Sequence, residues 1–326
     1  MQRWRQRPVG SNWGDFGADD QHGTLNFITR EVRLAAAAEI REGLAFLLSM
    51  PLDYPRGSVV TESRHPPRLG KTFLYDEGMT KDSYHIFCDD KVEMCLQYST
   101  QWDALSHIGA RFDADGDGVA EHVYYNGYRG GEHICADAGG DRPQARALGI
   151  ERLAETCVQG RGVMVDLHAR YGDTRVVVGF DALREAMDAQ GAVIEPGDIL
   201  CLHTGLAGLI LDRGDALTPD ELHGSCATLD GSDTRLLDWI EQSRIAAIIS
   251  DNIAVEQFDP TGADGGRLPL HDKCLFRLGL PLGELWYLRD LAAWLRANRR
   301  TRFFLTAPPL RLPGAVGSPA SGVATV

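Results

Sequence analysis

Four short apolar segments in the second half of the chain are separated by segments with helical periodicity. The apolar segments are residues 162–168, 198–203, 246–251 and 303–307, and each has the length and composition of a buried strand. Helical patterns cover residues 30–43, 144–157, 180–190, 234–242 and 289–298, and a capping box begins at Thr218. Strands that alternate with helices in this way predict an α/β fold.

The organisation of the chain shows no clear division. Its 326 residues leave room for two domains of about 150 residues, but neither an internal repeat nor a linker separates them. We therefore expect one domain across residues 1–326, with an irregular segment at 1–30 and a C-terminal tail at 311–326. A stretch rich in Pro, Gly and Arg at 57–70 and a glycine-rich stretch at 104–142 predict long surface loops, which are often functional in compact domains.

Charge and cysteine content exclude several classes of protein. The chain has 46 acidic and 33 basic residues, a net charge of −13, which argues against a nucleic-acid partner because such affinity comes mostly from neutralising phosphates. No apolar run approaches the ~20 residues needed to span a bilayer, and the first residues lack a signal-peptide pattern. Seven scattered cysteines with no Cys-x-x-Cys spacing predict reduced thiols in a cytoplasmic protein.

Within residues 91–107, the side chains from Val92 to Asp103 alternate between mainly apolar and mainly polar with a period of two. This alternation is typical of a strand, and it would place Gln97, Gln101 and Asp103 on one face with His107 just beyond them. In a helix, Asp103 would instead lie ~240° around the axis from Gln97. The row is either a functional, oxygen-rich surface or the solvent face of a half-exposed strand.

The spacing Gln97-x-x-x-Gln101-x-Asp103-x-x-x-His107 resembles the metal motif of the cyclase family of metal-dependent hydrolases, which includes bacterial kynurenine formamidases and isatin hydrolases. That family has histidine at the first two positions, and the glutamines here are similar to a subgroup that includes trans-dienelactone hydrolase. Further resemblances lie at Trp13-Gly14, residues 23–29, residues 160–166, Leu268-Pro269-Leu270-His271 and Gly283-Glu284-Leu285. Together they cover about residues 11–310.

The resemblance implies a swivelling β/β/α fold, a single cyclase-like domain with a mixed sheet, and self-association into a dimer or tetramer. It also implies the roles of individual residues. The metal ligands would be Gln97, Gln101, Asp103, His271 and Glu284, and the acid–base residue would be His107. The segment 121–128 would line the substrate pocket, so the expected substrate-binding residues are Trp102, Tyr124, Tyr125 and Asn126.

The chemistry of such a site is consistent with these residue types. A divalent cation lowers the pKa of its bound water and polarises a carbonyl, and a histidine with a pKa near ~6.5 can move the proton. Glutamine offers a hard amide oxygen where histidine offers a nitrogen, which weakens zinc binding and favours manganese or magnesium. Asp103, His271 and Glu284 alone would make a three-ligand site. We expect Zn²⁺, with Mn²⁺ as the alternative.

The resulting expectation is a hydrolase that opens a small lactone or cyclic amide. The alternatives are an N-formyl amide hydrolase and a metal-free binding protein for small molecules. An anionic substrate would need a cation, for which Arg111 and Arg129 are candidates. Asp113, Asp115 and Asp117 resemble the start of a calcium loop, but Tyr124 stands where a bidentate glutamate is required. The chain contains neither a Gly-x-Ser-x-Gly elbow nor a phosphate-binding loop motif.

Overall fold

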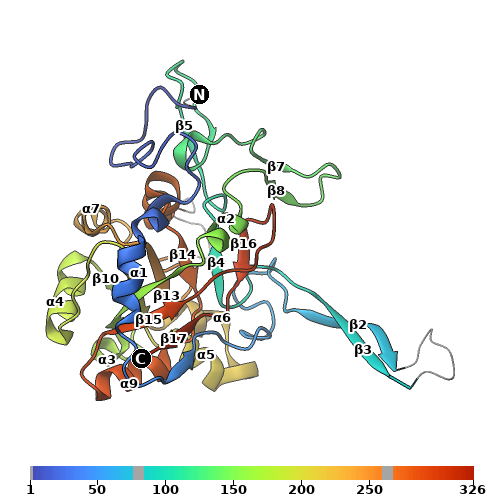
Figure 1. Cartoon of the computed structure of the whole chain (residues 1–326), viewed down its shortest axis with the longest axis vertical. Coiled ribbons are helices and arrows are strands. Elements are labelled where there is room, and N and C mark those ends of the chain that lie inside the picture. Colours follow the sequence, from blue (N-terminus) through green and yellow to red (C-terminus); the bar gives the residue numbers. More distant parts are fainter. Residues whose placement is uncertain (1–2, 76–83, 259–266) are drawn as a thin grey trace.

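The computed structural model describes residues 3–75, 84–258 and 267–326. Within these ranges, nine strands form one mixed sheet (Figure 1). In spatial order they are β1 (Ala45–Leu47), β17 (Val323–Thr325), β15 (Arg302–Thr306), β9 (Gln159–Asp166), β11 (Ile199–His203), β13 (Ala247–Ser250), β14 (Leu282–Glu284), β4 (Gln101–Asp103) and β16 (Gly317–Pro319). The α/β class and the mixed sheet expected from the sequence are confirmed.

The centre of the sheet is parallel and its two sides are antiparallel. Strands β9, β11, β13 and β14 run parallel, whereas β15 and β4 pair antiparallel with β9 and β14. Helices α4 (Phe180–Gln190) and α7 (Thr234–Ser243) pack on one face, and α1 (Arg30–Ala37) and α9 (Arg289–Ala297) pack on the other. The buried strands are apolar on both sides because both faces are covered.

Most helices predicted from periodicity are present. Helices α4, α7 and α9 occupy the expected ranges. Helix α6 (Pro219–Gly224) is capped by the preceding Thr218, whose hydroxyl accepts a hydrogen bond from the Glu221 amide at 3.2 Å. The predicted helix at 144–157 is wrong over its first half. There, β8 (Pro143–Ala145) pairs with β7 (Ile134–Ala136), so that only α2 (Ile150–Glu155) is helical.

The remaining elements are short. They are η1 (Gly23–Phe27), β5 (Ala110–Phe112), β6 (Glu121–Val123), η2 (Tyr125–Gly127), α3 (His168–Tyr171), β10 (Val176–Val178), α5 (Leu206–Arg213), η3 (Gly214–Ala216), β12 (Ala227–Leu229), α8 (Pro269–His271) and a π-helical turn, η4 (Asp272–Leu278). The segment 104–142 therefore has little regular structure, as expected for a long loop region. Among the described residues, no helix is long and apolar enough to cross a membrane.

The expected C-terminal tail at 311–326 is instead part of the sheet. Strand β16 pairs with β4, and β17 lies between β1 and β15. Val326 is fully buried, and its amide donates a hydrogen bond to the Leu44 carbonyl at 3.0 Å. This end of the chain therefore contributes to the core and supports the strand that carries Asp103.

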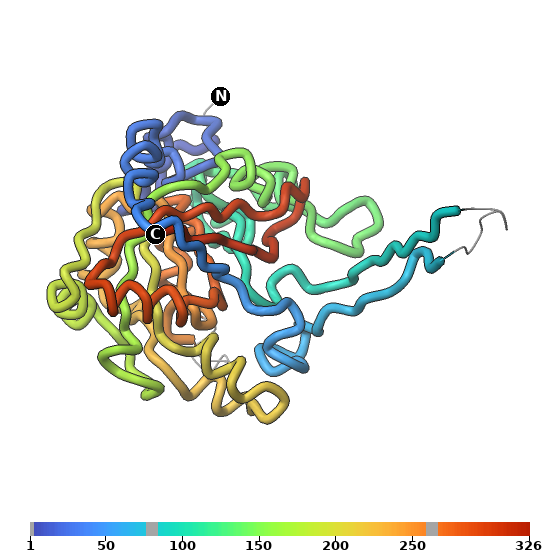
Figure 2. The backbone as a smooth tube through the Cα atoms, turned by 60° about the horizontal axis from the view of Figure 1, so that its bottom comes forward, coloured from blue at the N-terminus to red at the C-terminus, as the bar shows by residue number. Residues whose placement is uncertain are grey.

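The strand expected across residues 92–103 is divided in two. Strand β2 (Arg68–Tyr75) pairs with β3 (Phe87–Glu93) in a ribbon that extends away from the rest of the molecule (Figures 1 and 2). β3 ends at Glu93, turns follow, and β4 begins at Gln101. The polar alternation therefore belongs to two different sheets. The seven cysteines all lie within the described residues and none forms a disulfide.

Candidate metal centre

Three ionisable side chains that are far apart in the sequence converge beside the end of β14. Asp103 lies on β4, Glu284 on β14 and His271 on α8, and one ligand atom of each lies within 4.8 Å of the others. Antiparallel pairing places Gln101 opposite Glu284, and the Gln101 amide nitrogen donates a hydrogen bond to Glu284 Oε2 at 3.3 Å. All four side chains are buried. The sheet register thus assembles the cluster.

The alternation of β4 decides which of its residues face this cluster. Gln101 and Asp103 share one side of the strand, and Trp102 points to the other. The Trp102 indole donates a hydrogen bond to the Ala307 carbonyl at 2.8 Å and packs against Trp286 with ring centroids 5.2 Å apart. Trp102 is therefore a core residue, and its expected contact with substrate does not fit the structure.

In the sequence, Gln97 precedes β4 and His107 follows it. The Gln97 side chain lies against Gly317, the residue of β16 that pairs with Asp103. The contact is close: a Cβ atom added to Gly317 would lie 2.3 Å from the Gln97 amide nitrogen. His107 follows β4 in a turn, and its Nε2 lies 3.8 Å from Asp103 Oδ1. The His107 side chain is 25% exposed, whereas Asp103 is buried. His107 thus stands between the cluster and solvent.

The donor atoms of this cluster are suited to a divalent cation. Both carboxylate oxygens of Asp103 and the amide oxygen of Gln101 are buried and have no hydrogen-bond partner among the described residues. A buried carboxylate without a partner is costly, by several kcal/mol as an order of magnitude. Together with Glu284 and the imidazole of His271, these oxygens form a mixed oxygen and nitrogen donor set of the kind that binds Zn²⁺ or Mn²⁺. The residues therefore fit the metal that the sequence resemblance implies.

The electrostatics of the cluster follow from its burial. Burial raises the pKa of Asp103, while the nearby His107 opposes this shift and Glu284 adds to it. Burial also acts to raise the pKa of Glu284, but the hydrogen bond and charge of His271 lower it overall. Desolvation acts to lower the pKa of His271, but its bonds to Glu256 and Glu284 outweigh this and raise it to about 10.

Glu256 is a residue of this site that sequence reasoning did not find. Its buried carboxylate accepts hydrogen bonds from His271 Nδ1 at 2.8 Å and from the His271 amide at 2.9 Å, and its other oxygen accepts from the Leu270 amide at 2.9 Å. His271 Nε2 is thereby directed towards Glu284, 3.3 Å away. A carboxylate behind a metal-binding histidine is a common way to fix its ring and tautomer.

Arg64 is a second residue that the sequence did not indicate. Its guanidinium donates a hydrogen bond from Nη1 to the Gln97 carbonyl at 2.9 Å, and its charge acts to lower the pKa of both Asp103 and Glu284. Arg129, by contrast, is paired with Glu121 at 2.7 Å. Arg111 is exposed on β5. Of these three arginines, Arg64 is the one whose charge acts on Asp103 and Glu284.

The segment expected to line the substrate pocket is mostly engaged within the protein. Tyr125 is buried and its hydroxyl donates to Asp20 at 3.1 Å, and the Asn126 amide donates to the Gly17 carbonyl at 3.1 Å. Tyr124 is half-buried and lines a small hollow of about 150 Å³ with Arg111. Of these three residues, Tyr124 alone is placed to meet a ligand.

The Asp113–Asp117 loop is organised by its own backbone. Asp113 accepts hydrogen bonds from the amides of Gly116 at 2.7 Å and Gly118 at 2.9 Å, and Asp117 accepts from Val119 at 2.8 Å. The three carboxylates come close together. This hydrogen bonding is that of a Gly-Asp turn.

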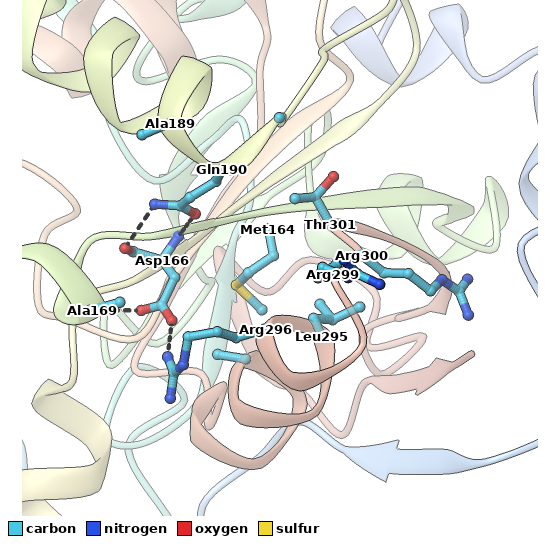
Figure 3. A pocket seen from close by; sticks show the side chains of 12 residues that line it. Met164, Asp166, Ala169, Ala189, Gln190, Leu295, Arg296, Arg299, Arg300 and Thr301 are labelled. Carbon is cyan, nitrogen blue, oxygen red and sulfur yellow. Dashed lines mark hydrogen bonds and ion pairs between the residues drawn. The ribbon is translucent and has the colours of Figure 1, made fainter.

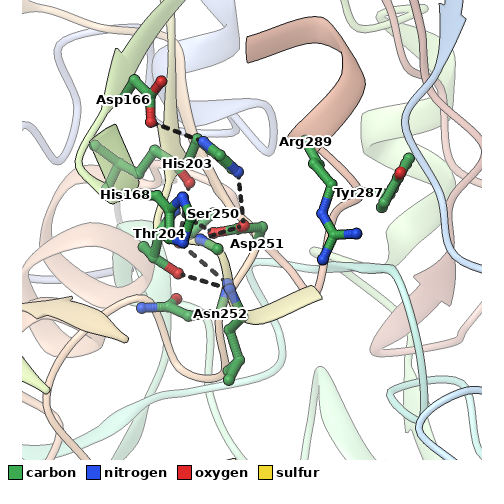
Figure 4. Close-up of polar contacts among 12 residues, drawn as sticks. Asp166, His168, His203, Thr204, Ser250, Asp251, Asn252, Tyr287 and Arg289 are labelled. Atoms are coloured by element: carbon green, nitrogen blue, oxygen red, sulfur yellow. Dashed lines mark hydrogen bonds and ion pairs between the residues drawn. The ribbon is translucent and has the colours of Figure 1, made fainter. Parts of the chain in front are cut away.

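A second cluster lies at the ends of the parallel strands (Figure 4). The strand register places it on the opposite face of the sheet from Glu284. His203 Nδ1 lies 2.8 Å from Asp166 Oδ1, and its Nε2 lies 3.8 Å from Asp251. Asp251 also accepts hydrogen bonds from the Thr204 and Gly205 amides at 2.5 and 2.8 Å. Because every carboxylate here has a protein partner, this cluster fixes the loop before α5.

Beside Asp166 a hollow of about 430 Å³ opens next to α9 and the end of α4 (Figure 3). It contains Arg296, Arg299 and Arg300, but Arg296 pairs with Asp166 and Arg300 lies 3.5 Å from Glu39. The strand register places this hollow on the opposite side of the sheet from Glu284. It is therefore separate from the candidate metal centre.

Comparison with known proteins identifies the family. The family model called Cyclase matches residues 46–257, which is more than half of the chain. The chain belongs to the Cyclase family. A crystal structure described as a novel cyclase resembles this family member with a TM-score of 0.81 and 34% identity, over 97% of this chain and 99% of the other. No curated protein matches the chain.

More distant structures share the fold of this cyclase-family chain. Isatin hydrolase A from Ralstonia solanacearum matches with a TM-score of 0.58 and 16% identity, over 91% of this chain and 97% of the other. An isatin hydrolase bound to the product analogue thioisatinate matches with a TM-score of 0.56 and 13% identity, over 91% and 99%. At these identities the likeness establishes a common fold.

Proposed function

We propose that this cyclase-family protein is a metal-dependent hydrolase that opens a small lactone or cyclic amide. The observation that carries the proposal is the buried, unpartnered carboxylate of Asp103, which lies within 4.8 Å of ligand atoms of His271 and Glu284, beside the unpartnered amide oxygen of Gln101. Membership of the Cyclase family supports the same reaction class. So does the shared fold with isatin hydrolases, because isatin is a cyclic amide.

In this proposal five residues hold the metal, which is Zn²⁺ or Mn²⁺. They are Gln97, Gln101, Asp103, His271 and Glu284. A bound divalent cation would make a coordinated water more acidic and polarise the substrate carbonyl. Glu256 keeps the His271 ring in one orientation, and the buried position of Asp103 prevents bulk water from competing for its oxygens.

His107 is the proposed acid–base residue. Its imidazole lies close to Asp103 Oδ1 but remains partly open to solvent, so it can reach both the attacking water and the group that leaves. Nε2 accepts a proton as the water attacks the carbonyl and returns it to the oxygen or nitrogen of the opened ring.

The test is metal analysis of the full chain, purified without chelator, combined with assays on a panel of lactones and cyclic amides. We expect close to one equivalent of a transition metal, hydrolysis that stops after chelation, and recovery when Zn²⁺ or Mn²⁺ is returned. Hydrolysis that is unaffected by complete removal of metal would contradict the proposal. Specific binding of these compounds without turnover, by protein with or without metal, would favour a binding protein on the same scaffold.

A further inference from the structure

Arg64 is held beside the metal centre by a loop that is fixed at several points. The buried Tyr98 donates hydrogen bonds from its hydroxyl to the carbonyls of Pro55 and Gly57, the latter at 2.8 Å. The Cys95 thiol approaches the Ser63 carbonyl at 3.7 Å. Arg64 Nη1 then donates to the Gln97 carbonyl at 2.9 Å. The loop at 55–64 and the turn at 95–98 therefore position Arg64 together.

The charge of Arg64 is not neutralised by a nearby carboxylate. Among residues 3–75, 84–258 and 267–326, no acidic oxygen lies within 4.0 Å of its guanidinium, and its side chain makes one hydrogen bond, to a neutral carbonyl. A guanidinium has five N–H donors in a planar fork. Most of these donors therefore remain available on a half-buried side chain beside the site.

The charge of Arg64 also acts on two of the proposed metal ligands. Its charge acts to lower the pKa of Asp103 and of Glu284, which lie on the two paired strands of the centre. Arg129, one of the two arginines that the sequence suggested, is paired with Glu121 and also donates to the Arg3 carbonyl at 3.2 Å. Arg129 therefore has less capacity to bind a ligand.

We infer that Arg64 determines substrate specificity by binding a carboxylate carried by the lactone or cyclic amide. This inference rests on the proposed hydrolase function and names its substrate class: cyclic esters or amides that are themselves acids. In a chain of net charge −13, with Asp103, Glu284 and Glu256 beside the site, an anion would be repelled without a local cation. A guanidinium fork matches the two oxygens of a carboxylate.

The test uses two hydroxamates to distinguish binding at the metal from binding at the Arg64 guanidinium. Succinic acid monohydroxamate and butyrohydroxamate each carry one metal-binding group, and they differ in ending with a carboxylate or a methyl group. Calorimetry on the zinc- or manganese-loaded full chain measures both affinities. Because hydrogen bonds to charged groups are worth about 1.5–3 kcal/mol, we expect the wild-type protein to prefer the succinic probe by roughly 10- to 100-fold.

Variants assign that preference to Arg64. Arg64→Gln should bind both hydroxamates with similar affinity, Arg64→Lys should keep part of the preference, and Arg68→Gln, an exposed arginine on β2, should behave as the wild type. Metal content and melting temperature should be the same for all four proteins. With carboxylated and neutral lactones, Arg64→Gln should raise KM for the acid by a larger factor than KM for the neutral lactone.

The two hypotheses fail in different ways. Equal wild-type affinity for the two hydroxamates, or a preference that survives in Arg64→Gln, overturns the role of Arg64 and leaves the hydrolase proposal intact. If neither hydroxamate binds more tightly to metal-loaded protein than to chelated protein, the metal-centre proposal is wrong and the inference about Arg64 falls with it. Loss of metal from Arg64→Lys and Arg64→Gln together would make Arg64 a structural support of the centre and also overturn the inference.

Discussion

The carboxylate of Glu256 accepts two hydrogen bonds from His271, one from Nδ1 at 2.8 Å and one from the backbone amide at 2.9 Å. This double contact fixes both the position of the residue and the orientation of its ring. Nε2 is left facing Glu284, which is the direction in which a metal ligand must point. Glu256 is therefore a positioning residue for the proposed metal centre.

Replacement of Glu256 should weaken metal binding without removing any ligand. We expect Glu256→Gln to lower metal affinity by about 10- to 100-fold, the usual effect of losing a partner of a metal-binding histidine. Titration of metal-free protein with Zn²⁺ or Mn²⁺ measures the change. Glu185→Gln, at an exposed residue paired with Arg170, is the matched control. Unchanged affinity in Glu256→Gln would show that the His271 ring is fixed by other contacts.

The oxygen ligands should differ in how much they contribute to metal retention. Asp103→Ala removes a buried charge next to His271 and Glu284, whereas Gln97→Ala removes a neutral amide at the edge of the site. Because a carboxylate supplies charge and an amide does not, Asp103→Ala should lose metal more completely. Elemental analysis after dialysis provides the measurement. Greater loss from Gln97→Ala would reverse this ranking of the ligands.

His107 should affect turnover and not metal content. We expect His107→Ala to retain the metal of the wild-type protein and to lose about 10²- to 10⁴-fold in kcat, the usual range for a missing acid–base group. Paired metal analysis and steady-state kinetics on a hydrolysed lactone provide the check. If the variant loses metal and activity in parallel, His107 is a ligand and the assigned role is wrong.

The cluster of His203 with Asp166 and Asp251 predicts a pH dependence of stability. Burial opposes a charged imidazole, but the hydrogen bond to Asp166 and the charge of Asp251 raise the pKa of His203 overall. This contribution to the free energy of unfolding is fully present below the unfolded pKa of ~6.5 and is lost as the pH rises through the higher folded value.

Urea unfolding at a series of pH values from 6 to 9 tests this prediction. Wild-type stability should fall across that range by more than the stability of His203→Gln. The variant loses the hydrogen bond to Asp166, which keeps its pair with Arg296, so it should be about 1–3 kcal/mol less stable near pH 6. His168→Gln, at a partly exposed histidine that pairs with Asp173, is the control. Parallel pH profiles for wild type and His203→Gln would contradict the assignment.

Sequence patterns correctly predicted helices and strands that bury their own apolar residues, because that burial appears in the sequence as a periodic pattern. The helix at Phe180–Gln190 and the strand at Ile199–His203 are examples, because each faces a core through its own apolar residues. Gly317–Pro319 shows the opposite case. Its Gly-Ser-Pro composition gives no strand signal, and it is a strand because β4 pairs with it. Long-range pairing of this kind leaves no local pattern to detect.

The candidate site was predictable to the extent that it follows a motif. The spacing of Gln101 and Asp103 placed both on one strand face, but the same alternation continued through the turn before Gln101 and so suggested one long strand. Glu256 and Arg64 reach the site through irregular loops, where neither spacing nor periodicity links a residue to its contact. The residues that support the site are therefore visible in the structure alone.

The last prediction concerns the choice between esters and formamides. We expect kcat/KM to be higher for compact lactones than for N-formylkynurenine, because an ester releases an oxygen that needs less protonation than an amine. The glutamines at 97 and 101 support this expectation, since neutral oxygen ligands donate less charge to a metal than histidines and favour a more acidic bound water. A side-by-side assay of lactones, a cyclic amide and N-formylkynurenine on the same metal-loaded protein decides the question. Chelated protein serves as the blank, and His107→Ala shows whether each hydrolysis uses the same acid–base group. A higher kcat/KM for the formamide would make this protein an N-formyl amide hydrolase.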